Sequence, residues 1–137
     1  MVESWIIYST ASLVIFGITN FLFKYISDKA PIAVLATIIS ISSVIIPLGY
    51  FLYGGGKFQI SNSTLIIAVA FGLLFSISFI FLGYSLRSGF ASKVIPVVNL
   101  NTLVTVALAV LILNEKLTPK IGLGIGFAIV SLYLLTS

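Results

Sequence analysis

The chain has 137 residues, of which 60% are apolar and only 7% charged, and its mean hydropathy is +1.27. A soluble domain carries roughly 25% charged residues, so this chain has too few to cover a water-facing surface, and we predict an integral membrane protein. The chain contains no cysteine and no histidine, which excludes disulfides and cysteine-ligated metals. Its net charge of +4 includes no run of Lys or Arg, which excludes a nucleic-acid-binding patch. We predict no cofactor.

Five apolar stretches follow one another, each bounded by charged or turn residues. They cover residues 4–25, 31–53, 64–86, 92–113 and 119–136. Roughly 20 apolar residues cross a bilayer core, with a range of about 17 to 25, so four stretches fit comfortably and the fifth is at the short limit. Because long continuous runs in a bilayer satisfy their backbone polar groups as helices, the sequence predicts an all-α membrane protein. Its five transmembrane helices would form one domain over residues 1–137.

Polar and small residues recur on single faces of the first four predicted helices. Together with charged and aromatic residues near the helix ends, they are the candidate substrate-binding residues: Trp5, Ser9, Phe16, Asn20, Ser43, Ser76, Tyr84, Arg87, Lys93 and Asn99. Ordinary helix packing, with Ser hydroxyls bonded to their own backbone, explains such stripes equally well. Asparagine is costlier to bury, and this favours a pocket for Asn20 and Asn99.

Arg87 and Lys93 flank the short turn between the third and fourth stretches. Both side chains are long enough to snorkel to the membrane interface. The alternative is that they point inward and bind an anionic group, such as a carboxylate or phosphate. Tyr84 and Trp5 would then supply an apolar wall, although aromatic residues at helix ends usually form the interfacial belt.

Pro47 and Pro96 lie inside the second and fourth stretches, where either can kink its helix and act as a hinge. Secondary transporters bind substrate near the bilayer midplane at kinked or discontinuous helices. The three glycines 54–56 lack the GK[ST] ending of a phosphate-binding loop. These features favour a transporter rather than an enzyme.

The stretch NEKLTPKIGLGIG, residues 114–126, forms the predicted turn before the last helix. Thr118 can cap that helix, and Pro119 suits its first position, where a missing N–H costs nothing. Glu115 is interpreted as a structural charge close to the positive helix start, with a role in transport as the alternative. The same stretch predicts a helix boundary at residue 119.

A GxxxG pattern begins the last helix, and at 100° per residue one stripe contains Gly122, Gly126, Ile129 and Tyr133. Glycines let two membrane helices approach until their backbones touch. This stripe is the predicted dimer interface, with packing inside the monomer as the alternative.

The C-terminal part of the chain resembles an EamA-like domain, the repeat unit of the drug/metabolite transporter superfamily. The matching features are Ser92, Val94 and Pro96, then Glu115 with Leu117–Thr118, then the glycine-bearing last helix. The resemblance is specific over residues 83–137 and looser before. Most members carry two inverted repeats, whereas this chain has one and is similar to single-repeat transporters. The resemblance implies export or exchange of small metabolites, amino acids or drugs by alternating access, without ATP.

The last two helices are also similar to those of the small multidrug resistance proteins, which use a carboxylate inside the membrane to exchange protons for cationic drugs. Here the acids are only Glu3, Asp28 and Glu115, all at helix ends or in turns. We therefore expect transport of a small zwitterionic or anionic metabolite. A drug exporter with an aromatic pocket and a non-transporting membrane subunit are the alternatives.

Orientation in a membrane follows the Lys and Arg residues of short loops. The two sides of the predicted bundle carry Lys57, Lys116 and Lys120 against Lys24, Lys29, Arg87 and Lys93. A difference of one is too small to set the topology. We therefore predict an antiparallel homodimer, inserted in both orientations into a prokaryotic cell membrane among its lipids, which restores an inverted pair of repeats.

Overall fold

The computed structural model describes residues 4–57 and 59–136, and every regular element within them is an α-helix. The elements are α1 (Ser4–Ser27), α2 (Ile32–Ser43), α3 (Ile45–Tyr53), α4 (Asn62–Ser88), α5 (Ala91–Asn99), α6 (Asn101–Leu113) and α7 (Pro119–Thr136). Four segments are long and apolar enough to cross a membrane: Ile6–Ser27, Ile32–Tyr53, Asn62–Ser88 and Ala91–Leu113. The apolar part of α7 is shorter, as its sequence predicts.

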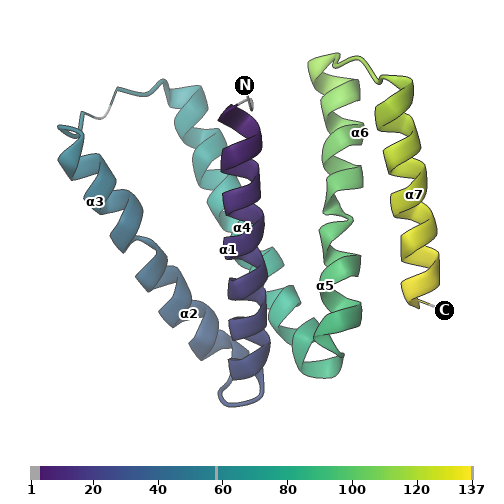
Figure 1. Cartoon of the computed structure of the whole chain (residues 1–137). Coiled ribbons are helices and arrows are strands. Elements are labelled where there is room, and N and C mark those ends of the chain that lie inside the picture. Colours follow the sequence, from purple (N-terminus) through teal and green to yellow (C-terminus); the bar gives the residue numbers. More distant parts are fainter. Residues whose placement is uncertain (1–3, 58, 137) are drawn as a thin grey trace. The chain divides into compact units, whose positions relative to one another are not determined.

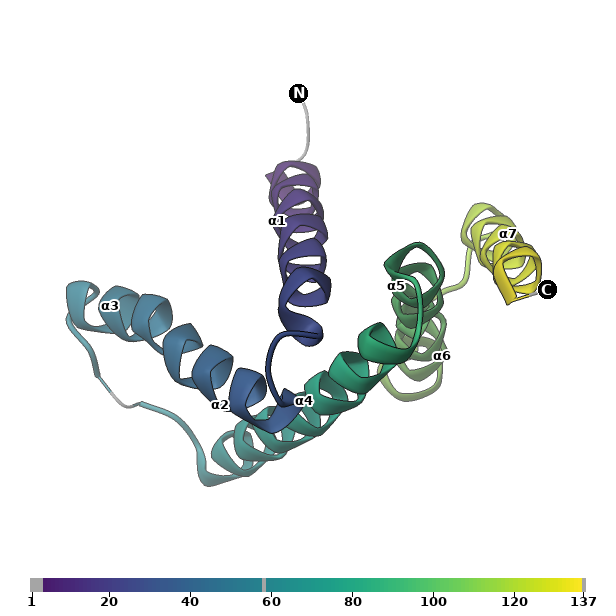
Figure 2. The same cartoon turned by 90° about the horizontal axis from the view of Figure 1, so that it is seen from below.

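The chain divides into two compact units, the first ending at Ser88 and the second beginning at Gly89. In the first unit, α4 packs against both α1 and α2. These helices come together near the turn that joins α1 to α2 (Figures 1 and 2). The second unit contains α5, α6 and α7, and α5 contacts α7. The two units are described separately, and a single domain over residues 1–137 stays a prediction.

The core of the first unit lies at the end where α1 finishes, α2 begins and α4 finishes. Its buried residues are Phe23, Ser27, Ile32, Ala36, Gly83 and Leu86. Phe23 also stacks on Phe79 of α4, with ring centroids 4.4 Å apart and planes inclined by 9°. The helices α1 and α4 run in the same general direction (Figure 1), and the contacts of Lys24 with Leu86 and of Arg87 with Ser27 place their C-termini side by side.

Gly83 is the point of closest approach between these helices. A Cβ atom added at this position would lie 2.8 Å from Cγ2 of Ile32 and 3.0 Å from Cζ of Phe23. Both neighbours are buried, with Ile32 1% exposed and Phe23 4% exposed, so neither side chain has room to move away. The missing side chain of Gly83 is therefore what lets α4 pack against α1 and α2 at once.

Two of the predicted membrane spans, Ile32–Tyr53 and Ala91–Leu113, are each divided into two helices near the prolines that were expected to kink them. The first interruption is at Val44, three residues before Pro47. Pro47 has no N–H for the carbonyl of Ser43, which is where α2 ends. The N–H of Val44 instead bonds back to Ile41 over three residues, and α3 resumes with Leu48 bonding to Val44. The break therefore precedes the proline instead of lying on it.

The second interruption, at Leu100, lies four residues after Pro96, which stays inside α5. The hydroxyl of Thr102 donates to the carbonyl of Asn99. The N–H of Leu103 bonds to Leu100, at a spacing of three residues. A side chain thus replaces a main-chain donor at the end of α5, and the helix restarts as α6.

The turn between α6 and α7 confirms the predicted helix start. The hydroxyl of Thr118 accepts the N–H of Ile121 at 3.3 Å, and α7 begins at Pro119. On the other side of the turn, Asn114 ends α6 with a left-handed backbone, φ 56° and ψ 33°. Asparagine is among the few non-glycine residues that adopt this conformation readily. The turn is therefore built from local sequence signals at both ends.

Candidate functional site

The most highly connected polar group in the first unit is the guanidinium of Arg87, in the last turn of α4. Its Nε donates to the carbonyl of Ser27 at 2.9 Å, and its Nη2 donates to the same carbonyl and to that of Ala30. Ser27 ends α1, and Ala30 lies in the turn that follows. Carbonyls at a helix C-terminus have no partner within the helix. Arg87 of α4 therefore caps α1.

Lys24, in the last turn of α1, makes the converse contact. Its Nζ donates to the carbonyl of Leu86 near the end of α4 at 2.5 Å and lies 3.7 Å from the carboxylate of Asp28. The Lys24 side chain is 28% exposed. A lysine in the last turn of a helix is a recognised capping signal, so the position of Lys24 in the sequence indicates a cap, although it does not indicate which helix is capped. The carbonyl that Lys24 caps belongs to a residue 62 positions away, so no local sequence pattern predicts this pairing.

A further cation lies in the turn between α1 and α2. The ammonium of Lys29 lies 3.3 Å from the centre of the Tyr25 ring, a cation–π contact. We use the name basic end for Lys24, Lys29 and Arg87 together with the carbonyls that they contact. The basic end carries three cations against one carboxylate, that of Asp28, so it is positively charged.

The remaining predicted substrate residues are not gathered around one enclosed cavity within either unit. The Ser43 and Ser76 hydroxyls donate to carbonyls of their own helices, at 2.8 and 2.9 Å. Asn20 is half-buried. Like Ser43 and Ser76, the following residues are exposed: Ser9, Phe16, Tyr84, Lys93 and Asn99. The side chain of Trp5 lies outside the described part of the structure. A shared substrate pocket for these residues stays a prediction.

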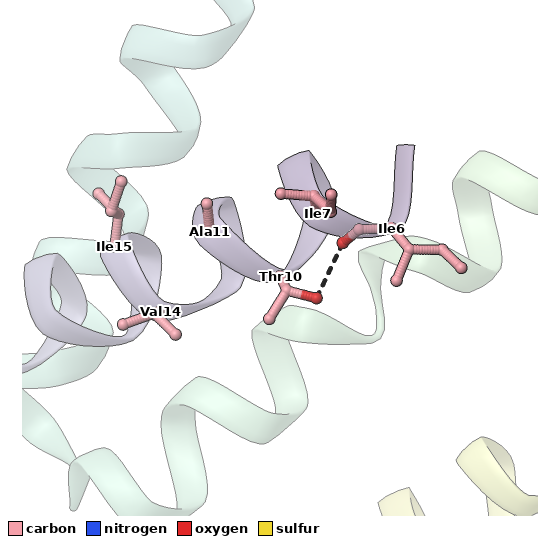
Figure 3. Close-up of a pocket in the computed structure, with 6 residues that line it drawn as sticks. All are labelled: Ile6, Ile7, Thr10, Ala11, Val14 and Ile15. Atoms are coloured by element: carbon pink, nitrogen blue, oxygen red, sulfur yellow. Dashed lines mark hydrogen bonds between the residues drawn. The ribbon is translucent and has the colours of Figure 1, made fainter. Parts of the chain in front are cut away.

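Two shallow, open hollows each lie along a single helix. One is lined by α1 residues alone: Ile6, Ile7, Thr10, Ala11, Val14 and Ile15 (Figure 3). Its only polar side chain is Thr10, whose hydroxyl donates to the carbonyl of Ile6 at 2.8 Å. The other hollow lies on α2 between Ala33 and Ile38. With one wall each and no available polar donor, these hollows suit lipid chains better than a polar substrate.

The predicted dimer stripe on α7 has no close neighbour at its glycines. A Cβ added at Gly122 or Gly126 would meet nothing within 4 Å, in contrast to Gly83. Ile129 and Tyr133 of the same stripe are exposed, while Ile125 and Ala128 are half-buried. At Gly122 and Gly126, α7 therefore has no close neighbour within the second unit.

Within the described residues, no cluster of three or more Asp or Glu side chains could hold a metal ion. The described acids are Asp28 and Glu115, and both lie in turns between helices. The features closest to the middle of predicted membrane spans are instead the interruptions at Val44 and Leu100, within Ile32–Tyr53 and Ala91–Leu113. Because Pro47 has no N–H, the carbonyl of Ser43 lacks its usual helical partner, and such a main-chain group can bind a ligand. At the second interruption, the carbonyl of Asn99 accepts the hydroxyl of Thr102 instead.

Comparison with known proteins gives matches over most of the chain. Residues 3–137 match the EamA-like transporter family. An archaeal relative from Methanocaldococcus jannaschii, named only as an uncharacterized protein, is 29% identical over 123 residues, which are 90% of this chain and 89% of the relative. No solved structure gives a significant match.

Proposed function

The chain belongs to the EamA-like transporter family, and we propose that it is a secondary transporter of small amino-acid-like or anionic metabolites that works by alternating access. As a multi-pass membrane protein of this family, it contacts lipid through its apolar helices. The observation that carries the mechanism is the pair of interruptions at Val44 and Leu100. Discontinuous helices near the midplane are where secondary transporters bind their substrates.

The preference for a zwitterionic or anionic substrate rests on the charges. Proton-coupled export of cations needs a carboxylate within the membrane, and the two described acids lie in turns instead. An acid placed inside a span would be costly to keep and would mark a proton or cation site. Lys93, near the start of α5 and exposed, is the available cation that we assign to the substrate's anionic group.

We further propose that the working unit is an antiparallel homodimer in a prokaryotic cell membrane. Two observations support this. The matched region fills 89% of the M. jannaschii relative, which leaves no room there for a second repeat. The glycine face of α7, at Gly122 and Gly126, has no neighbour within 4 Å of an added Cβ and is free to pack against a second copy.

The test is a thermal-shift screen of the purified protein against amino acids, phosphorylated metabolites and cationic dyes, followed by flux measurements in liposomes. A stabilising ligand from the first two groups that is also transported would support the proposal. Stabilisation by cationic dyes alone would instead indicate a drug exporter. If no ligand shifts the unfolding temperature and no flux occurs, the protein is a non-transporting subunit.

A further inference from the structure

The contacts at the basic end are reciprocal between two parallel helices. Arg87 of α4 donates to the last carbonyl of α1, while Lys24 of α1 donates to a carbonyl in the last turn of α4. Each helix thus supplies the cap of the other. The arrangement satisfies carbonyls that a bilayer interface would otherwise leave without a protein partner.

Lys24 and Arg87 also stabilise this contact electrostatically. The C-terminus of a helix carries about half a negative charge, and two such ends lie side by side where α1 and α4 finish in parallel. Their mutual repulsion would drive the ends apart. Lys24 and Arg87 place a positive charge against each end, so they convert a repulsive contact into an attractive one.

Burial is confined to the same end of the unit. Among the described side chains of the first unit, the buried ones lie in 23–36 and 83–86, and none of those described in the starts of α1 and α4 or in α3 is buried. Beyond Val44 the helix restarts after its interruption. Among the described side chains of this unit, the buried ones therefore lie where α1, α2 and α4 meet (Figures 1 and 2), and those of the far end are more exposed.

We propose that Lys24 and Arg87 are positioning residues, which cross-cap α1 and α4 and make the basic end the fixed pivot about which the far ends of this unit move. The movement rests on the transport function proposed above, whereas the clamp itself does not. The assignment removes Arg87 from the substrate-binding residues that the sequence analysis predicts, because its donors are directed to the carbonyls of Ser27 and Ala30.

The test uses pairs of spin labels in the full-length protein in liposomes, without any ligand, since the chain has no native cysteine. One pair, Leu22→Cys with Ser85→Cys, reports on the basic end; a second, Tyr8→Cys with Ile66→Cys, reports on the far end. These four positions are exposed. We expect a narrow distance distribution for the first pair and a broad one for the second.

Arg87→Gln keeps a hydrogen-bond donor but loses the charge, so the narrow distribution should become as broad as that of the far pair. Arg87→Lys should restore it, and Lys57→Gln, a cation of the exposed loop of the same unit, should leave it unchanged. If Arg87→Gln does not fold, Lys24→Gln provides the same comparison. An unchanged narrow distribution in the Gln variant, or failure of Arg87→Lys to restore it, would overturn the clamp. Because no substrate is used, absence of transport does not affect this result.

Discussion

Addition of one methyl group at Gly83 tests the packing of the first unit most directly. In Gly83→Ala, the new Cβ would lie 2.8 Å from Cγ2 and 3.2 Å from Cδ1 of Ile32 and 3.0 Å from Cζ of Phe23. Ile32 is branched at Cβ and has little rotamer freedom in a helix, and Phe23 is held by its stacking on Phe79. The helices must therefore move apart to accept the methyl group.

The change in the free energy of unfolding caused by Gly83→Ala is the sum of two opposing contributions. Overpacking a filled site costs about 1–3 kcal/mol. Alanine is favoured over glycine inside a helix by about 0.8–1.0 kcal/mol in peptides, which offsets part of the cost. Gly72→Ala is the matched control, because Gly72 lies in the same helix and an added Cβ there meets nothing within 4 Å. The propensity gain is common to both variants, so their difference isolates the steric cost, about 1–3 kcal/mol in favour of Gly72→Ala.

Unfolding in mixed micelles of dodecyl maltoside and SDS measures the free energy of unfolding of Gly83→Ala and of Gly72→Ala. A double variant identifies the clash: Ile32→Ala removes two of the three atoms that the new methyl group meets and leaves Cζ of Phe23, so Gly83→Ala should cost less in that background than in the native one. If Gly83→Ala is as stable as Gly72→Ala, the helices are not in close contact at this position and the packing argument fails.

The remaining predictions concern transport and topology. Replacing Asn20 or Asn99 by leucine should reduce flux while the solubilised protein stays folded; normal flux in both variants, or loss of the fold in both, would make these residues structural. Lys93→Gln should weaken binding of an anionic ligand more than Lys57→Gln, because Lys57 lies in an exposed loop, and equal effects would favour snorkelling of Lys93. A single cysteine introduced at Asn62, the exposed first residue of α4, should be about half labelled by an impermeant thiol reagent on intact cells. The reason is that the numbers of Lys and Arg residues on the two sides differ by only one. Labelling near zero or near complete would contradict the antiparallel dimer.

Features set by a few neighbouring residues follow from the sequence alone. Hydropathy locates the apolar segments because the bilayer requires a particular length of apolar helix. The hydroxyl of Thr118 and the ring of Pro119 start α7 as predicted, because a cap and its N–H partners lie within one turn. Pro47 likewise predicts that its helix lacks a main-chain hydrogen bond, although the break itself occurs at Val44.

Features set by residues far apart in the chain needed the tertiary structure. The sequence places Arg87 and Lys93 together at a turn, yet Arg87 is directed to carbonyls 57 and 60 residues away. The same holds for Lys24 and for Gly83, whose neighbours Phe23 and Ile32 belong to two other helices. In sequence, Gly83 is no more prominent than Gly122, although one is closely packed and the other is open. Periodicity defines which face of a helix a residue occupies, but only the packing of separate helices decides what that face meets.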